Sequence, residues 1–146
     1  MNFNKLYNLL MEDIFKKIWS SKDIPVDYTG AVIWPNTGMK EYFLKGKYHR
    51  EDGPAIERLD GMQEWWWNGH IHRGGGLPAI IEPDGTEYWC RHGKIHREDG
   101  PAVVRPNGDN EYWLDDKPYS RIDWKRELIR RGIIKDPSLE DVMDAI

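Results

Sequence analysis

The chain of 146 residues is long enough for one domain with a modest hydrophobic core. Its net charge of −4 argues against a protein that binds long nucleic acids by neutralising phosphates. The single cysteine, Cys90, excludes an intramolecular disulfide and a zinc site built from several thiolates. The sequence also has no secretory signal and no apolar run long enough to span a membrane. We therefore expect a cytoplasmic protein without membrane contact.

Residues 1–24 are predicted to form an amphipathic helix, because their apolar positions alternate in steps of three and one. Pro25 disfavours helical geometry at Ile24, so the helix should end near residue 20. Its apolar face has to cover another part of the protein. The stripe consists of Phe3, Leu6, Tyr7, Leu10, Met11, Ile14, Phe15, Ile18 and Trp19.

Residues 28–120 carry a repeat with a period of 23 to 24 residues. The ten residues from Gly46 to Ala55 return almost unchanged from Gly93 to Ala102, and a degenerate copy lies between them. A period of this length indicates one small supersecondary unit stacked on itself. Asp-Gly and Asn-Gly pairs between short β-prone runs are hairpin signals. We therefore predict a mainly β fold of stacked hairpins in a twisted antiparallel meander.

Each predicted hairpin turn is followed by an acidic residue and then by aromatic residues. Neighbouring residues of a strand point to opposite faces of a sheet, so adjacent aromatic side chains cannot share one core. One aromatic row must line the other side of the sheet, and we regard it as the candidate functional surface. The runs are Glu41-Tyr42-Phe43, Glu64-Trp65-Trp66, Glu87-Tyr88-Trp89 and Glu111-Tyr112-Trp113.

Residues 120–146 are predicted to be a helical cap within the same domain. Ser120 has the features of a helix N-cap, and Arg130-Arg131-Gly132 those of a helix end. The pair Asp136-Pro137 predicts a second short helix that ends near Val142. Repeat arrays need such atypical ends to cover exposed edges.

The repeated sequence resembles the His-Arg-x-Asp-Gly-Pro-Ala repeat proteins of bacteria, phages and large DNA viruses, which are distant variants of MORN-type repeats. The resemblance covers about residues 30 to 121. It implies stacked hairpins in one long meander and a binding role of open specificity. The chain lacks the recurrent Gly-x-Gly spacing of standard MORN repeats, so their membrane roles are not carried over.

The repeated motif has a structural interpretation as a turn. In this interpretation each Asp accepts backbone hydrogen bonds or pairs with the nearby Arg, each Gly takes a positive φ, and each Pro starts the next strand. The residues concerned are His49, Arg50, Asp52, Gly53, Pro54, His72, Pro78, His96, Asp99, Gly100 and Pro101.

A metal site is not predicted from the histidines of the motif. Equivalent residues of stacked hairpins stand roughly 10 Å apart, whereas zinc ligands lie about 2 Å from the ion. A second grouping, His70 and His72 with His92, has no evident carboxylate or thiolate to complete it.

The degenerate copy departs from the motif at Arg73-Gly74-Gly75-Gly76-Leu77, which leaves Arg73 without a local Asp and adds one residue. One interpretation is that this Arg binds a phosphate or a carboxylate, and that the glycines let the backbone come close to it. The other is that the repeat has simply degenerated at this point. Arg side chains are also expected to stack on Trp rings. The candidate binding residues are Trp65, Trp66, Trp67, Arg73, Trp89, Arg91, Arg97 and Trp113.

No catalytic motif stands out, so we expect neither an enzyme nor a cofactor. The leading hypothesis is a phage or bacterial binding module that presents an aromatic and Arg-bearing sheet face to another protein, with inhibition of a host-defence protein as its concrete form. The alternative is sequestration of a small anionic ligand, such as a nucleotide signal, in a pocket around Trp66, Trp67 and Arg73. A third hypothesis is structural self-assembly into homo-oligomers.

Overall fold

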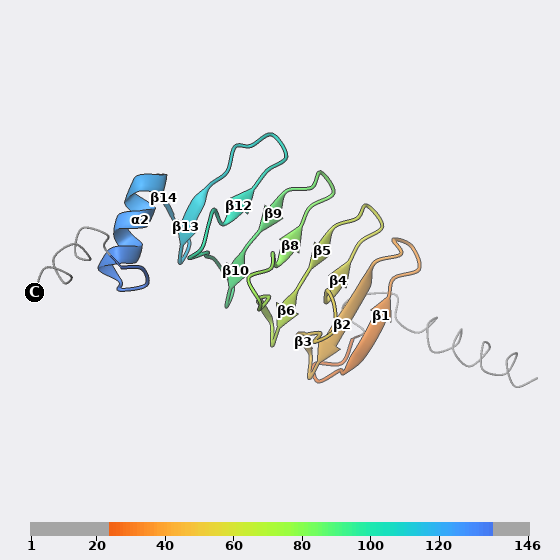
Figure 1. Ribbon diagram of the computed structural model, residues 1–146. Coiled ribbons are helices and arrows are strands. Elements are labelled where there is room, and N and C mark those ends of the chain that lie inside the picture. Colours follow the sequence, from red (N-terminus) through yellow and green to blue (C-terminus); the bar gives the residue numbers. More distant parts are fainter. Residues whose placement is uncertain (1–23, 136–146) are drawn as a thin grey trace, which may run out of the picture.

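The computed structural model describes residues 24–135, and this part of the chain is mainly antiparallel β-sheet with one short helix (Figure 1). The β prediction is confirmed at this level. The predicted N-terminal helix and the second C-terminal helix from residue 136 lie outside the described residues. The division into segments 1–24, 28–120 and 120–146 of one domain stays a prediction.

The principal sheet has eight strands in the order β1-β2-β4-β5-β8-β9-β12, with β3 paired to β2. All of the pairings are antiparallel. The strands of this sheet follow one another in chain order, as in a meander, with β3, β6–β7 and β10–β11 inserted between sheet neighbours. The strands are β1 (Gly30–Ile33), β2 (Lys40–Leu44), β3 (Lys47–Tyr48), β4 (Ile56–Glu57), β5 (Gln63–Glu64), β8 (Ile80–Ile81), β9 (Glu87–Tyr88) and β12 (Val103–Val104).

Three small hairpins extend the ribbon beyond this sheet. The chain passes from β5 into the first hairpin at Trp65 and from β9 into the second at Trp89, and these two residues still donate backbone hydrogen bonds to the next repeat. In these two repeats, a strand of the main sheet therefore continues directly into a strand of a small hairpin. The small hairpins are β6 (Trp66–Trp67) with β7 (His70–Ile71), β10 (Cys90–Arg91) with β11 (Lys94–Ile95), and β13 (Tyr112–Leu114) with β14 (Lys117–Tyr119).

The turns of the small hairpins have both central residues in the left-handed region. Asn68 has a φ of 49° and Gly69 a φ of 82°, and the equivalent residues of the other repeats also have positive φ. This is the type I′ geometry, whose twist matches that of the flanking strands and which favours Asn-Gly. The pairs Gly46-Lys47, Gly69-His70 and Gly93-Lys94, which open the repeats in the sequence, are therefore the second halves of tight turns.

These turns also join one repeat to the next. The amide of Gly69 donates to the carbonyl of Tyr48 in the preceding repeat at 2.9 Å, and the amide of Gly93 donates to Ile71 at 2.9 Å. Because the bond is repeated at each turn, the small hairpins stack on one another in register. The Gly at this position serves both the turn and the stack.

The buried position that recurs in each repeat is occupied by a small residue, because a single layer of strands leaves little space between its two faces. Ala55, Ala79 and Ala102 are completely buried, one in each repeat. The large aromatic side chains are half-buried on the faces. The packing of this protein therefore depends on side chains that lie over one another on the surface of the sheet.

Helix α2 (Arg121–Arg130) lies at one end of the row of strands in Figure 1. Ser120 is its N-cap and accepts a hydrogen bond from the Asp123 amide at 3.1 Å, as predicted. Leu128 is buried, and the Trp124 ring packs against Tyr112 with their centroids 4.9 Å apart. The helix covers the last hairpin. None of the helices within residues 24–135 is long and apolar enough to cross a membrane.

Substitution Gly46→Ala is expected to lower the free energy of unfolding by about 2 kcal/mol. Gly46 has a φ of 71°, and an added Cβ would overlap the carbonyl oxygen of Val26. Gly74→Ala is the matched control, because Gly74 has no positive φ and its added Cβ would meet no atom within 4 Å. Urea denaturation of the two variants measures the difference. Equal losses would contradict the assigned role of this turn.

Candidate functional site: the Arg–aromatic ladder

The aromatic side chains divide between the two faces of the sheet, because residues along a strand alternate. On one face, the indole of Trp66 donates to Glu64 two residues before it at 2.7 Å, and that of Trp113 donates to Glu111 at 2.7 Å. Trp65, between Glu64 and Trp66, points to the other face. In these two runs the preceding acid therefore accepts from the second aromatic residue after it.

The acidic residues on this first face are hydrogen-bonded to aromatic side chains of the same sheet. Glu41 is buried, and it accepts bonds from the indole of Trp34 at 2.7 Å and the hydroxyl of Tyr48 at 2.8 Å. Burial, followed by the hydrogen bond from the Tyr48 hydroxyl to Glu41, raises the pKa of that hydroxyl above its usual value. The indole N–H groups of Trp66 and Trp113 are likewise occupied, so these two candidates serve the sheet.

On the opposite face, an arginine lies over an aromatic ring in each of three repeats. The guanidinium carbon of Arg73 stands 3.7 Å from the ring centre of Trp65, and that of Arg97 stands 3.9 Å from Trp89. Such contacts are favourable cation–π interactions. We call this series the Arg–aromatic ladder. It consists of Arg50 over Tyr42, Arg73 over Trp65 and Arg97 over Trp89.

Every arginine of the ladder is also tied to the proline of its own motif. An Nη1 group donates to the carbonyl of Pro54 at 3.2 Å, of Pro78 at 3.1 Å and of Pro101 at 3.2 Å in the three repeats. Ring and carbonyl together fix both the position and the orientation of the guanidinium. The Arg and Pro of the motif are therefore parts of one arrangement.

The first and third arginines have a carboxylate as a further partner. Arg50 Nε donates to Asp52 at 2.8 Å, and Arg97 Nε donates to Asp99 at 2.6 Å. Of the two partners that the sequence left open for each Asp, the arginine is the one observed. The hydrogen bond from Arg50 holds the pKa of Asp52 below its usual value.

The prediction of positive φ at the motif glycines is wrong. Gly53 and Gly100 are not among the residues with positive φ. Instead, a Cβ at Gly53 would stand 2.9 Å from the guanidinium carbon of Arg50, and one at Gly100 would stand 3.3 Å from that of Arg97. The motif requires glycine because the folded-back arginine occupies the space of a side chain.

Arg73 keeps the ring and the proline carbonyl but has no carboxylate partner among the described residues. Gly75 stands two residues after it, where Asp52 follows Arg50. Glu57, which binds Arg50 at 2.7 Å, is replaced in this repeat by Ile81. Partial burial lowers the pKa of Arg73. The middle member of the ladder is therefore incomplete.

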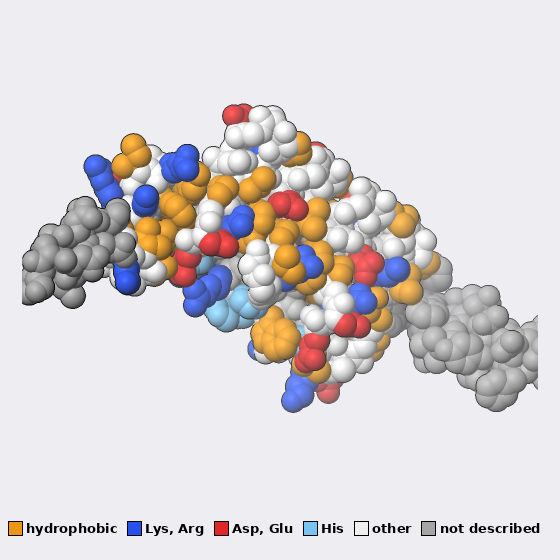
Figure 2. Space-filling view, viewed as in Figure 1, with side chains coloured by type: hydrophobic (Ala, Val, Ile, Leu, Met, Phe, Trp, Pro, Cys, Tyr) orange, Lys and Arg blue, Asp and Glu red, His pale blue; other side chains and the backbone are white. Residues whose placement is uncertain are grey.

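Two exposed apolar residues, Trp67 and Leu77, belong to the same repeat as Arg73. Trp67 is 43% exposed, and its ring centre lies 4.4 Å from that of His49. Leu77, in the glycine loop after Arg73, is 49% exposed. Sequence reasoning missed Leu77, although an apolar residue inside a glycine loop was the available signal. In Figure 2 a band of hydrophobic side chains crosses the strands with Lys and Arg among them.

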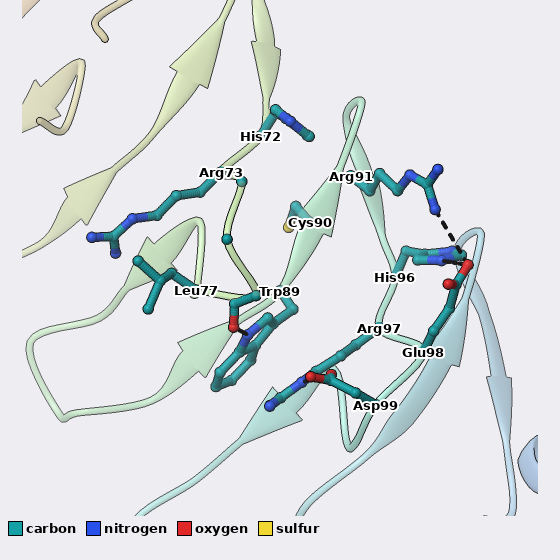
Figure 3. Close-up of a pocket in the computed structure, with 13 residues that line it drawn as sticks. His72, Arg73, Leu77, Trp89, Cys90, Arg91, His96, Arg97, Glu98 and Asp99 are labelled. Carbon is teal, nitrogen blue, oxygen red and sulfur yellow. Dashed lines mark hydrogen bonds and ion pairs between the residues drawn. The ribbon is translucent and has the colours of Figure 1, made fainter. Parts of the chain in front are cut away.

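A cavity of about 350 Å³ lies between the Gly74–Leu77 loop and the next repeat (Figure 3). Trp89 is part of its wall and donates to the Gly76 carbonyl at 2.8 Å. Trp66 and Trp67 do not line it, so this cavity does not bring these two residues together with Arg73. Trp66 is held on the opposite face by Glu64.

Apart from Arg73, the charged groups that line this cavity are paired with one another. Glu98 accepts from Arg91 at 3.2 Å and lies 2.9 Å from His96 Nε2, and Asp99 accepts from Arg97. Figure 3 shows the Arg73 side chain extending away from Glu98 and Asp99. The guanidinium groups of Arg91 and Arg97 are therefore already paired with carboxylates at this cavity.

The motif histidines accept hydrogen bonds from the turn of the next repeat. His49 Nδ1 accepts from the amide of Asn68 at 3.1 Å, and His72 Nδ1 accepts from the amide of His92 at 3.4 Å. These bonds give the histidines a structural role that the sequence did not reveal. The rings of His72 and His92 are stacked 4.6 Å apart. Within residues 24–135 no three His, Cys, Asp or Glu side chains form a metal-binding group.

Comparison with family models, curated proteins and solved structures finds no match to this chain. The resemblance to the His-Arg-x-Asp-Gly-Pro-Ala repeat proteins therefore stays a prediction from the motif.

His72 is expected to make stability depend on pH. Its pKa is lowered, first by burial and then by His92 and Arg91, from an ordinary value of 6.5. Because the unfolded chain takes up this proton at higher pH than the folded chain, stability is fully present above pH 6.5 and falls as the pH drops towards the lower folded pKa.

The measurement is urea denaturation of the protein and of His72→Gln between pH 7.5 and pH 5. The unsubstituted protein should lose more stability than the variant over this range. A constant difference between the two proteins at every pH would contradict the prediction.

Proposed function

We propose that this chain is a non-enzymatic binding module that recognises another protein through the surface formed by Arg73, Trp67 and Leu77. The observation that carries the proposal is the incomplete middle member of the ladder. Arg73 is held in place by a ring and a carbonyl, yet no carboxylate among the described residues neutralises it. A fixed cation and exposed apolar side chains in one repeat are the composition of a protein-binding hot spot.

The position of α2 supports this proposal. The helix packs on the last hairpin, at β13 and β14, so the described part of the chain has no helix over the middle repeat. Exposed apolar side chains rimmed by polar ones are typical of interaction surfaces. A partner that covers Trp67 and Leu77 would also remove the Arg73 guanidinium from water, which strengthens its hydrogen bonds.

Groups that catalysis would need are engaged in structural contacts, which favours binding over chemistry. The buried Glu41 accepts from an indole and a phenol, and His49 accepts from a turn amide of the next repeat. The thiol of Cys90 is buried, and burial raises its pKa to about 11, which makes it a poor nucleophile.

The sequence resemblance suggests the setting of this interaction. By that resemblance we propose a MORN-like repeat protein of phage or bacterial origin that acts in the bacterial cytoplasm. Its partner is then a host protein, and inhibition of a host-defence protein is the specific form that we propose. The Asp of the motif is missing beside Arg73 but present beside Arg50 and Arg97, and a change confined to one repeat fits a specific partner better than a general scaffold.

The test is native mass spectrometry of the untagged protein after incubation with bacterial lysate and gentle re-isolation. We expect a bound mass of protein size and an at least tenfold smaller yield of that complex with Arg73→Ala, which corresponds to about 1.4 kcal/mol. Arg126→Ala is the matched control, because Arg126 is an exposed arginine on α2. Circular dichroism checks that both variants fold.

Two outcomes would contradict the proposal. A bound mass of a few hundred daltons would identify a small-ligand binder. Self-multiples without any other mass would indicate structural assembly through sheet edges.

A further inference from the structure

We propose that Arg73 binds an aspartate or glutamate side chain of the protein partner, in the place that Asp52 takes on Arg50 and Asp99 takes on Arg97. This inference rests on the proposed function and names the chemistry of the partner. The protein contains the model for its own recognition site, because the same arrangement occurs complete in the repeats on either side.

The two complete copies define the geometry of the bound carboxylate. In each, the guanidinium lies over an aromatic ring at 3.9 to 4.0 Å, its Nη1 donates to a proline carbonyl at 3.2 Å, and its Nε donates to the carboxylate at 2.6 to 2.8 Å. The middle copy has the first two contacts, at 3.7 and 3.1 Å. Its Nε–H has no acceptor within the described part of the chain.

The glycine loop explains why no carboxylate of this chain takes the position. Gly75 replaces the Asp of the motif, and one additional residue precedes Pro78. The loop is also held towards the following repeat, because Trp89 donates to the Gly76 carbonyl at 2.8 Å. The space that the Glu-Asp pair of the motif fills in other repeats is occupied here by glycines without side chains.

The fixed position of the guanidinium favours binding. The ring of Trp65 and the carbonyl of Pro78 already hold the Arg73 side chain, so a partner orders little of it on binding. A charge-assisted N–H···O bond to a carboxylate is about twice as strong as a neutral one. Exposed Leu77 and Trp67 supply apolar area nearby along the chain.

A carboxylate fits this position better than a phosphate group. Both complete copies use the singly charged carboxylate of an aspartate. Asp99 also borders the loop, since a Cβ added at Gly76 would stand 4.0 Å from its Oδ2. A doubly charged phosphate would be repelled more strongly by this neighbouring charge.

The experiment follows the ¹⁵N-labelled Arg Nε–H signals by NMR while N-acetyl-aspartate N-methylamide is added. We expect a saturable shift of the Arg73 signal that is at least threefold larger than any shift of Arg50 or Arg97. N-acetyl-asparagine N-methylamide is the neutral control probe and should give no such shift. The absence of a saturable shift at Arg73, or equal shifts at all three arginines, would overturn the proposal.

Two variants and a second probe sharpen the result. Gly75→Asp supplies a carboxylate two residues after Arg73 and should abolish the response, whereas Gly75→Asn, which tolerates the φ of 73° equally well, should keep it. A response that persists unchanged in Gly75→Asp would place the probe elsewhere and overturn the proposal. Inorganic phosphate that acts at a tenfold lower concentration than the carboxylate probe would also overturn it.

This test separates the two proposals. If the Arg73 signal does not respond to the probe while Arg73→Ala still loses the partner, the binding function stands and the carboxylate assignment fails. If the signal responds but the lysate yields no protein complex, the site stands and the proposed function fails.

Discussion

The stacking of a guanidinium on an aromatic ring is the interaction on which this sheet depends. A single layer of strands has no second layer to cover its side chains, and the buried position that recurs in each repeat is a small residue, alanine. Arg50 over Tyr42 and Arg97 over Trp89 cover one face with their own side chains. Each such contact contributes about 0.5–1 kcal/mol at an exposed site, and repetition makes the sum substantial.

The same arrangement explains the whole motif as one unit. The arginine lies on the ring, the proline offers its carbonyl, the aspartate binds Nε, and the glycine leaves space for the folded-back side chain. The motif histidine joins the unit to the next repeat through a turn amide. A substitution in one part therefore changes the requirements on the others. The middle repeat keeps the arginine and proline while losing the aspartate, which is why we assign it a binding role.

Much of the fold could be predicted from the sequence, because the repeat spacing, the Asp-Gly turns and the Ser120 cap are local signals. The division of aromatic residues between two faces followed from strand alternation. The role of His49 could not be predicted, since its partner Asn68 lies 19 residues away in the next repeat. The prediction for Gly53 was wrong because the glycine was assigned to a turn with positive φ, whereas it is needed to leave space for the Arg50 guanidinium. The partner of the Trp66 indole, Glu64, was not predicted either, although it lies only two residues before it.

The central claim is that Arg50 and Arg97 serve the fold whereas Arg73 is available for a partner. The most direct measurement is the free energy of unfolding of Arg50→Gln, Arg73→Gln and Arg97→Gln in the isolated protein. All three variants lose a ring contact and a carbonyl bond, but the first and third also leave an aspartate without its partner. Our account predicts that Arg73→Gln is the least destabilising of the three. A loss for Arg73→Gln equal to or larger than the other two would contradict it.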